Sequence, residues 1–319
     1  MFAAYAAQRK TKMATWTTSS IPDQSGQLAI ITGATGGLGL ETALGLVGAG
    51  AEVILAGRNP TKGRDAEALI RQKYKSAKVR FELADMASLK SIKDFSDRML
   101  AAGSSINILV NNAGIMAPHD RGTTADGFEL QIGTNYLSHF ALTGRLLPLL
   151  SAAKARVIQL SSFGHRTGKI QLDDLNYEHG YDAFPVYSQS KLAMLMFALE
   201  LDRRSNAKGW GLTSVAAHPG FARTDLFANG PASGANIILR TIIPVAKLIM
   251  GQSAAAGALP TLMAATMPGV KGGQYFGPQG FKEFKGPPGL GKIESQALDA
   301  VVAAKLWTLS EDLTGVTYR

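Results

Sequence analysis

The order of apolar patterns along the chain is the feature that most limits its fold. Short runs rich in β-branched residues alternate with longer stretches that have a helical period. Because strand and helix alternate, the sequence predicts an α/β fold, in which a doubly wound parallel sheet carries helices on both faces in three layers. The expected strands are 28–32, 52–55, 78–83, 106–110, 155–160 and 212–216, and the expected helices are 41–48, 61–75, 89–102, 127–150 and 187–205.

The size and composition of the chain exclude several classes of protein. Its 319 residues, 46% of them hydrophobic, suit a single large globular domain. The net charge of +9 suits an anionic small molecule and nucleic acid equally well. With no cysteine there is no disulfide, thiolate nucleophile or cysteine-bound metal, and a reducing compartment, the cytoplasm, is indicated. The five histidines lack metal-ligand spacing, so no metal site is predicted.

The sequence predicts a single domain preceded by a flexible N-terminal tail. Residues 1–22 are predicted to be a flexible tail, because the basic first dozen residues lack the features of a signal peptide. Residues 23–319 form the domain, within which 227–291 is expected to be a substrate lid followed by a region rich in glycine and proline. The most apolar run, 236–250, is interrupted by charges and proline and falls short of the roughly 20 residues of a membrane span. No transmembrane segment is predicted.

A turn rich in glycine follows the first expected strand. Glycines at 33, 36, 37 and 39 let the backbone turn tightly and approach a pyrophosphate, which would lie at the N-terminus of the next helix. The spacing fits two dinucleotide-binding patterns, and a plain tight turn remains the alternative.

Arg58 stands at the end of the second expected strand, where an NAD site normally has a carboxylate that binds the ribose hydroxyl. A guanidinium suits a 2′-phosphate instead. Arg58 therefore favours NADP over NAD, unless it is simply a solvated surface arginine.

Tyr187 and Lys191 open an expected helix, and Ser161 and Ser162 end the strand before it. Residues four apart share a helix face, so an ammonium can lie beside the phenol. An adjacent cation and a bound nicotinamide cofactor would lower the phenol pKa from its usual value near 10. A phenol adjusted in this way is suited to acid–base chemistry on a carbonyl.

Together these motifs resemble the short-chain dehydrogenase/reductase family, most closely the bacterial relatives of retinol dehydrogenases and of the WW-domain-containing oxidoreductase. The resemblance is strong over residues 26–226 and implies a Rossmann-type sheet. It rests on the TGxxxGxG turn at 32–39, NNAG at 111–114, Asn135, YxxxK at 187–191, and HPG at 218–220 with Thr224.

The resemblance implies a role for each matching residue. Tyr187 would be the general acid in reduction and the general base in oxidation, and Lys191 would lower its pKa and hold the cofactor ribose. Ser162, with Ser161 as its rival, would bind the substrate oxygen, and Asn135 would fix a water in a proton relay. The implied cofactor-binding residues are Gly33, Thr35, Gly37, Leu38, Gly39, Arg58, Asn59, Asp85, Met86, Asn112, Ala113, Gly114, Tyr187, Lys191, Pro219, Gly220 and Thr224.

The predicted function is that of an NADP(H)-dependent oxidoreductase that interconverts a carbonyl and an alcohol on an apolar or bulky small-molecule substrate. A cofactor-binding sensor without turnover and a sugar-nucleotide epimerase are the alternatives. A serine hydrolase is disfavoured because GxSxG is absent. Nucleic acid is not an expected partner, and both a homodimer and a monomer fit the sequence.

Overall fold

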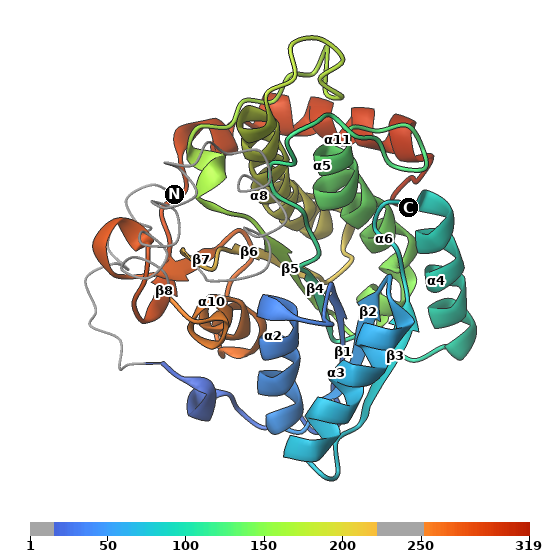
Figure 1. The fold of residues 1–319 in the computed structure, drawn as a ribbon, viewed down its shortest axis with the longest axis vertical. Coiled ribbons are helices and arrows are strands. Elements are labelled where there is room, and N and C mark those ends of the chain that lie inside the picture. Colours follow the sequence, from blue (N-terminus) through green and yellow to red (C-terminus); the bar gives the residue numbers. More distant parts are fainter. Residues whose placement is uncertain (1–15, 222–251) are drawn as a thin grey trace.

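The computed structural model describes residues 16–221 and 252–319, which form an eight-stranded sheet with helices on both faces (Figure 1). The strand order is β3-β2-β1-β4-β5-β6-β7-β8. The strands are β1 (Leu28–Thr32), β2 (Glu52–Gly57), β3 (Val79–Leu83), β4 (Ile108–Asn111), β5 (Arg156–Leu160), β6 (Thr213–Ala217), β7 (Tyr275–Pro278) and β8 (Pro288–Leu290).

All neighbouring strands from β3 to β7 are parallel, and only β8 runs antiparallel, against β7. The chain order reverses at β1, which lies between β2 and β4. Connections on the two sides of this point leave the sheet in opposite directions, which opens a crevice at the carboxyl ends of the strands. The turns after β1, β2, β4, β5 and β6 therefore meet along one edge.

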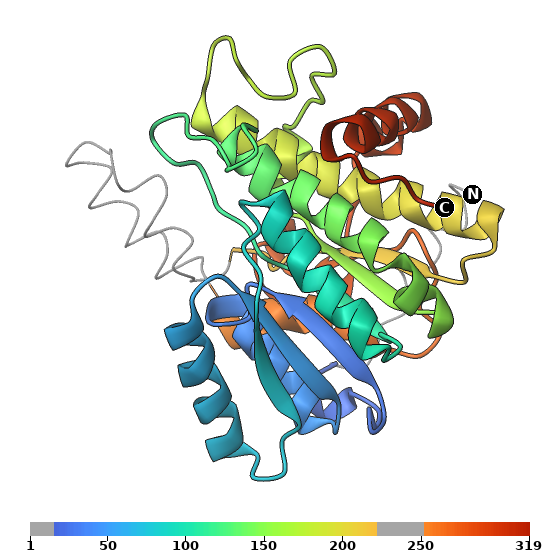
Figure 2. The same ribbon diagram turned by 90° about the vertical axis from the view of Figure 1, so that its right-hand side faces the viewer.

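The helices cover both faces of the sheet, as Figure 2 shows from the side. The longer helices are α2 (Gly37–Gly48), α3 (Pro60–Lys73), α4 (Leu89–Ala102), α6 (Ser138–Arg145), α8 (Ala183–Lys208), α10 (Ala254–Thr266) and α11 (Ala300–Thr314). The shorter ones are η1 (Thr18–Ser20), α5 (Leu130–Ile132), the π-helical turn η2 (Gly133–Leu137), α7 (Leu147–Ala152), η3 (Phe163–Arg166), η4 (Phe281–Glu283) and η5 (Ser295–Leu298).

Two apolar cores hold the three layers together, one on each face of the sheet. On one face Phe95 of α4, Phe140 of α6 and Trp307 of α11 belong to one core, in which α11 packs on α8 and α6. On the other face Leu46 of α2 and Leu262 of α10 belong to the second core. Strands β1, β2, β4 and β5 contribute to both cores because successive side chains point to opposite faces.

The predicted parallel sheet is confirmed, and its first six strands lie within two residues of the expected bounds. The helix expected over 127–150 is not continuous. It is divided into α5, η2, α6 and α7, and the π-helical turn η2 is wider than an α-helical turn.

Two boundaries differ from the sequence prediction. Within the predicted tail 1–22, Trp16 is 7% exposed and packs in the core that contains α2, so ordered structure begins before residue 23. Within the predicted lid 227–291, α10 packs on α2, and β7 and β8 extend the sheet. Two segments of the region 268–291, β7 and β8, are therefore part of the sheet, while the lid residues 227–251 lie outside the described residues.

Candidate functional site

A cavity of about 560 Å³ lies at the carboxyl edge of the sheet, where the crevice was expected. Its walls come from the turns after β1, β2, β4, β5 and β6 and from the start of α8. Ser162 lines the cavity. So do all the described residues that were predicted to bind the cofactor, which are Gly33, Thr35, Gly37, Leu38, Gly39, Arg58, Asn59, Asp85, Met86, Asn112, Ala113, Gly114, Tyr187, Lys191, Pro219 and Gly220. Thr224 lies outside the described residues.

The glycine turn leaves room for a phosphate at the N-terminus of α2. Gly33 and Gly37 have φ values of 65° and 52°, which favour glycine. A Cβ on Gly39 would lie 2.4 Å from the Gly33 carbonyl oxygen, whereas a Cβ on Gly36 would meet nothing within 4 Å. The turn is thus tightly packed at Gly39 and open at Gly36. The open side fits a pyrophosphate on the free N–H groups of the helix.

The Thr32 hydroxyl joins this turn to the one after β4, and it contacts a buried histidine, His139, that the sequence analysis did not select. The Thr32 hydroxyl accepts hydrogen bonds from the backbone N–H groups of Asn112 and Ala113, each at 2.9 Å. The His139 Nδ1 lies 2.8 Å from the carbonyl oxygen of Asn135, so Nδ1 carries the proton and Nε2 accepts from the Thr32 hydroxyl at 2.9 Å. Burial lowers the pKa of His139 to about 4, which keeps the ring neutral.

Tyr187, Ser162 and Lys191 meet at the end of the cavity near β5. The Tyr187 phenol is buried and shares a hydrogen bond with the Ser162 side chain. The Lys191 Nζ lies 5.9 Å from the centre of the Tyr187 ring and donates to the Leu160 carbonyl at 3.0 Å. The Ser161 hydroxyl instead donates to the Lys191 carbonyl at 2.7 Å. Of the two serines, Ser162 therefore presents its hydroxyl to the phenol.

The pKa of the phenol differs from the sequence expectation. Burial raises the pKa of Tyr187 to about 12, and the hydrogen bond to Ser162 offsets only part of this effect. Burial also lowers the pKa of Lys191 to about 8. In the protein alone, desolvation dominates the pKa of Tyr187, which is a protonated phenol at neutral pH.

Asn135 lies behind the cavity wall in η2 and is fully buried. Its side-chain oxygen accepts from the Ile115 N–H at 2.8 Å, and its amide donates to the Ile115 carbonyl at 3.0 Å and to the Ser190 hydroxyl at 2.9 Å. These contacts fix the backbone after the Asn112 turn against α8. The water-holding role that the resemblance implies for Asn135 stays a prediction.

The opposite end of the cavity is basic. Arg58 is exposed, and Asn59 caps α3 by accepting from the Lys62 N–H at 3.0 Å. This cap brings Lys62, which the sequence analysis did not select, to the cavity wall beside Arg58. The signal for it was available, because Asn59-Pro60 is a helix start and places Lys62 in the first turn.

Part of the cavity wall is apolar. It includes Met116, Phe163, Phe184 and Phe221, none of which the sequence analysis selected. Met116 packs against Tyr187. Phe184 is 53% exposed, with its ring centre 6.3 Å from that of Tyr187.

Lys191→Met is expected to make the protein more stable at pH 7, because the folded chain no longer buries an ammonium whose pKa burial lowers from 10.5 to about 8. The unfolded chain binds more protons between these values, so wild-type stability rises with pH there. The advantage of Lys191→Met should shrink by roughly 3 kcal/mol from pH 8 to pH 10.5, at about 1.4 kcal/mol per pKa unit. Urea unfolding of both proteins measures it. Lys208→Met, at the exposed end of the same helix, should show no such trend.

Within residues 16–221 and 252–319, no helix is long and apolar enough to cross a bilayer. The same residues contain no group of three or more histidine, aspartate or glutamate side chains that could hold a metal ion.

Comparisons with known proteins agree with the geometry. A model of the short chain dehydrogenase family matches residues 27–233. Human retinol dehydrogenase 13 is 39% identical over 91% of this chain and 85% of that protein, and mouse polyprenol dehydrogenase is 36% identical over 92% and 86%. A crystal structure of an uncharacterised Mycobacterium paratuberculosis protein superposes with a TM-score of 0.78 at 37% identity, covering 96% of this chain and all of that one.

Proposed function

The chain belongs to the short-chain dehydrogenase/reductase family, whose members are oxidoreductases, and we propose that it interconverts a carbonyl and an alcohol with NADP(H), using Tyr187 as acid and base. One observation carries the proposal. A single cavity has the Ser162, Tyr187 and Lys191 side chains at one end and the Arg58 and Lys62 cations at the other. The cavity therefore combines a proton donor with a place for an extra phosphate.

Three described side chains have separate roles in the proposed reaction. NADP(H), when bound, supplies or accepts the hydride. Tyr187 holds the proton that a reduced carbonyl oxygen needs, and its raised pKa keeps that proton in place at neutral pH. Ser162 shares a hydrogen bond with the phenol and is placed to donate to the same substrate oxygen. Lys191 brings a cation next to the phenol, favouring its deprotonated form in the reverse direction.

The apolar part of the wall indicates a substrate with a hydrophobic body. Met116 and Phe184 lie beside Tyr187, where an apolar group would lose water on binding. Retinol dehydrogenase 13 and polyprenol dehydrogenase are named for alcohols with long apolar chains. We therefore propose a bulky apolar aldehyde, ketone or alcohol as the substrate class.

Ser162→Ala is expected to lower kcat by about 100-fold, in the range for one lost hydrogen bond to a developing charge. Ser161→Ala should change kcat by less than about threefold, because the Ser161 hydroxyl bonds to the Lys191 backbone and not to the phenol. Steady-state kinetics of the two variants with the same carbonyl substrate makes the comparison. An equal loss of kcat in both variants would show that Ser162 acts through packing and does not donate to the substrate oxygen.

The loss of absorbance of NADPH, and then of NADH, in the presence of small and bulky aldehydes and ketones tests the proposal. We expect faster consumption of NADPH and higher kcat/KM for bulky apolar carbonyls. Tight NADPH binding without consumption would favour the sensor, and product formation without net cofactor use would favour the epimerase.

A further inference from the structure

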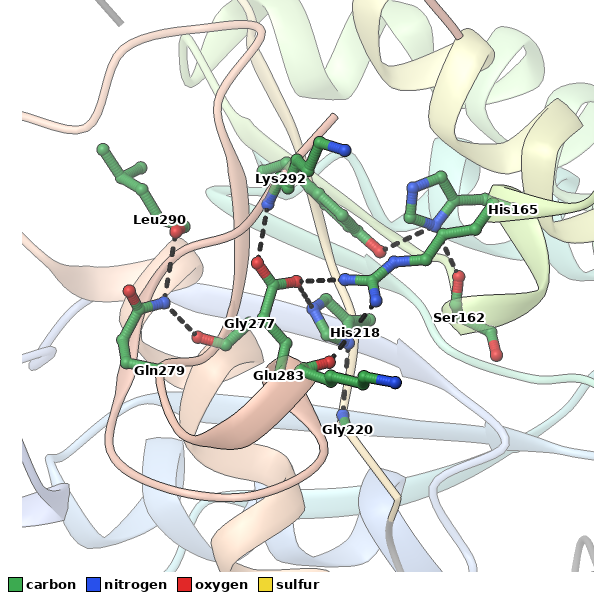
Figure 3. Close-up of polar contacts among 12 residues, drawn as sticks. Ser162, His165, His218, Gly220, Gly277, Gln279, Glu283, Leu290 and Lys292 are labelled. Carbon is green, nitrogen blue, oxygen red and sulfur yellow. Dashed lines mark hydrogen bonds and ion pairs between the residues drawn. The ribbon is translucent and has the colours of Figure 1, made fainter. Parts of the chain in front are cut away.

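The connection between β7 and β8 contains a buried carboxylate, Glu283, that contacts residues next to the cavity wall. Glu283, in η4, accepts a hydrogen bond from Arg166 at 2.8 Å, one from the Lys292 N–H at 3.0 Å and one from His218 at 3.2 Å (Figure 3). The Glu283 side chain is 10% exposed. The sequence analysis selected neither Glu283 nor Arg166, and the proposed chemistry does not use them.

The His218 contact connects Glu283 with the cavity. His218 Nδ1 accepts from the Gly220 N–H at 3.3 Å, so in the neutral ring the proton lies on Nε2, which donates to Glu283. Burial lowers the pKa of His218 and favours this neutral form. Since Gly220 lines the cavity, the carboxylate selects the ring tautomer that holds the Gly220 N–H.

The Arg166 contact connects Glu283 with the serine side of the same cavity. Arg166 ends η3, the turn that starts after Ser162, and its guanidinium lies 5.0 Å from the centre of the Phe163 ring. The His165 Nδ1 in this turn donates to the Ser162 carbonyl at 2.7 Å (Figure 3). One carboxylate thus contacts both segments that border Ser162 and Gly220.

Close packing fixes the geometry of this cluster. A Cβ on Gly277 would lie 1.9 Å from His218 Nε2, and a Cβ on Gly220 would lie 2.4 Å from the Phe284 carbonyl oxygen. Glu283 itself has a φ of 62°, a conformation that non-glycine residues rarely adopt. The connection is therefore held by its contacts and not by the preference of its own backbone.

We propose that Glu283 is a positioning residue: through His218 and Arg166 it sets the spacing between the Pro219–Gly220 wall and the Ser162 turn. The inference rests on the proposed function, because that spacing matters where the hydride-carrying half of the cofactor must meet Tyr187. The adenosine half belongs at the Arg58 end, away from Glu283. Loss of the carboxylate should therefore weaken binding of one half of the cofactor only.

The test compares each whole dinucleotide with its adenosine half. Kd values are measured for NADPH and 2′-phospho-ADP-ribose, and for NADH and ADP-ribose, with wild type and Glu283→Gln. We expect Glu283→Gln to bind the preferred dinucleotide about tenfold more weakly and its half by less than about twofold, as for the loss of one charge-assisted hydrogen bond. Equal weakening of both ligands, or of neither, would overturn the proposal. Which dinucleotide wild type prefers tests the proposed function separately.

Glu200→Gln is the matched control. Glu200 is also a buried carboxylate paired with two arginines, Arg203 at 2.6 Å and Arg204 at 2.7 Å, but it lies on α8 outside the cavity lining. Its replacement should lower the melting temperature and leave both Kd values unchanged. Arg166→Lys tests the same link from the other side if Glu283→Gln does not fold, and it should also weaken only the dinucleotide. A dinucleotide Kd unchanged in Arg166→Lys would contradict the positioning role.

Discussion

Tyr187→Phe is expected to lower kcat by about a thousandfold or more, because it removes the phenol proton that lies beside Ser162 in the cavity. The ring itself remains, so the cavity keeps its shape. In wild type, burial raises the phenol pKa to about 12, and the proton is held at neutral pH until a substrate oxygen accepts it. Phenylalanine leaves that oxygen without an acid.

The measurement is single-turnover reduction of a bulky aldehyde, together with the Kd of NADPH. Binding should change by less than about fivefold, since a lost phenol–serine hydrogen bond contributes about 1 kcal/mol or less to it. Tyr181→Phe is the matched control, because its hydroxyl donates to the Pro118 carbonyl at 3.1 Å and does not line the cavity. Its kcat should stay within about threefold of wild type. A Tyr187→Phe protein that retains a tenth or more of wild-type kcat would contradict the assignment of the acid.

The sheet could be predicted because its strands have local signals. Runs such as 28–32 and 52–57 are apolar and bounded by glycine turns, and the helix after each has a regular period. The Tyr187 end of the cavity was predictable for the same reason: Tyr187 and Lys191 are four residues apart on one helix. Their common face follows from helix geometry alone.

The parts that could not be predicted depend on contacts between distant segments. β7 and β8 lie in a region rich in glycine and proline, and they are strands only because β6 offers an open edge. The His218–Glu283 contact joins residues 65 apart, and His139 meets Thr32 across 107 residues. No pattern within either segment indicates its partner.

The pKa of Tyr187 also could not be predicted from the sequence. The sequence places a lysine four residues from Tyr187, which suggests a lowered pKa. It does not show that both groups are buried or that the Lys191 ammonium bonds to the Leu160 carbonyl. Desolvation depends on what covers the site, and that is decided by the whole fold.

Arg58→Asp is expected to reverse the cofactor preference, changing the ratio of kcat/KM for NADPH to that for NADH by about three orders of magnitude. Loss of a charge-assisted bond to the 2′-phosphate accounts for about 1.5–3 kcal/mol of the change. The new carboxylate repels the phosphate and accepts a hydrogen bond from the ribose hydroxyl of NADH, which supplies the rest. Lys62 remains at the wall, so some binding of NADPH should persist.

Arg64→Asp separates this local effect from the change in net charge. Arg64 is an exposed arginine on α3, six residues further along the chain than Arg58, and it lies outside the cavity lining. Its replacement changes the net charge by the same amount, and the cofactor ratio should shift by less than about threefold, because solvent and salt screen exposed charges at that range. If Arg58→Asp and Arg64→Asp shift the ratio equally, the preference arises from the overall positive field. A large shift in Arg58→Asp alone places the 2′-phosphate at the end of β2.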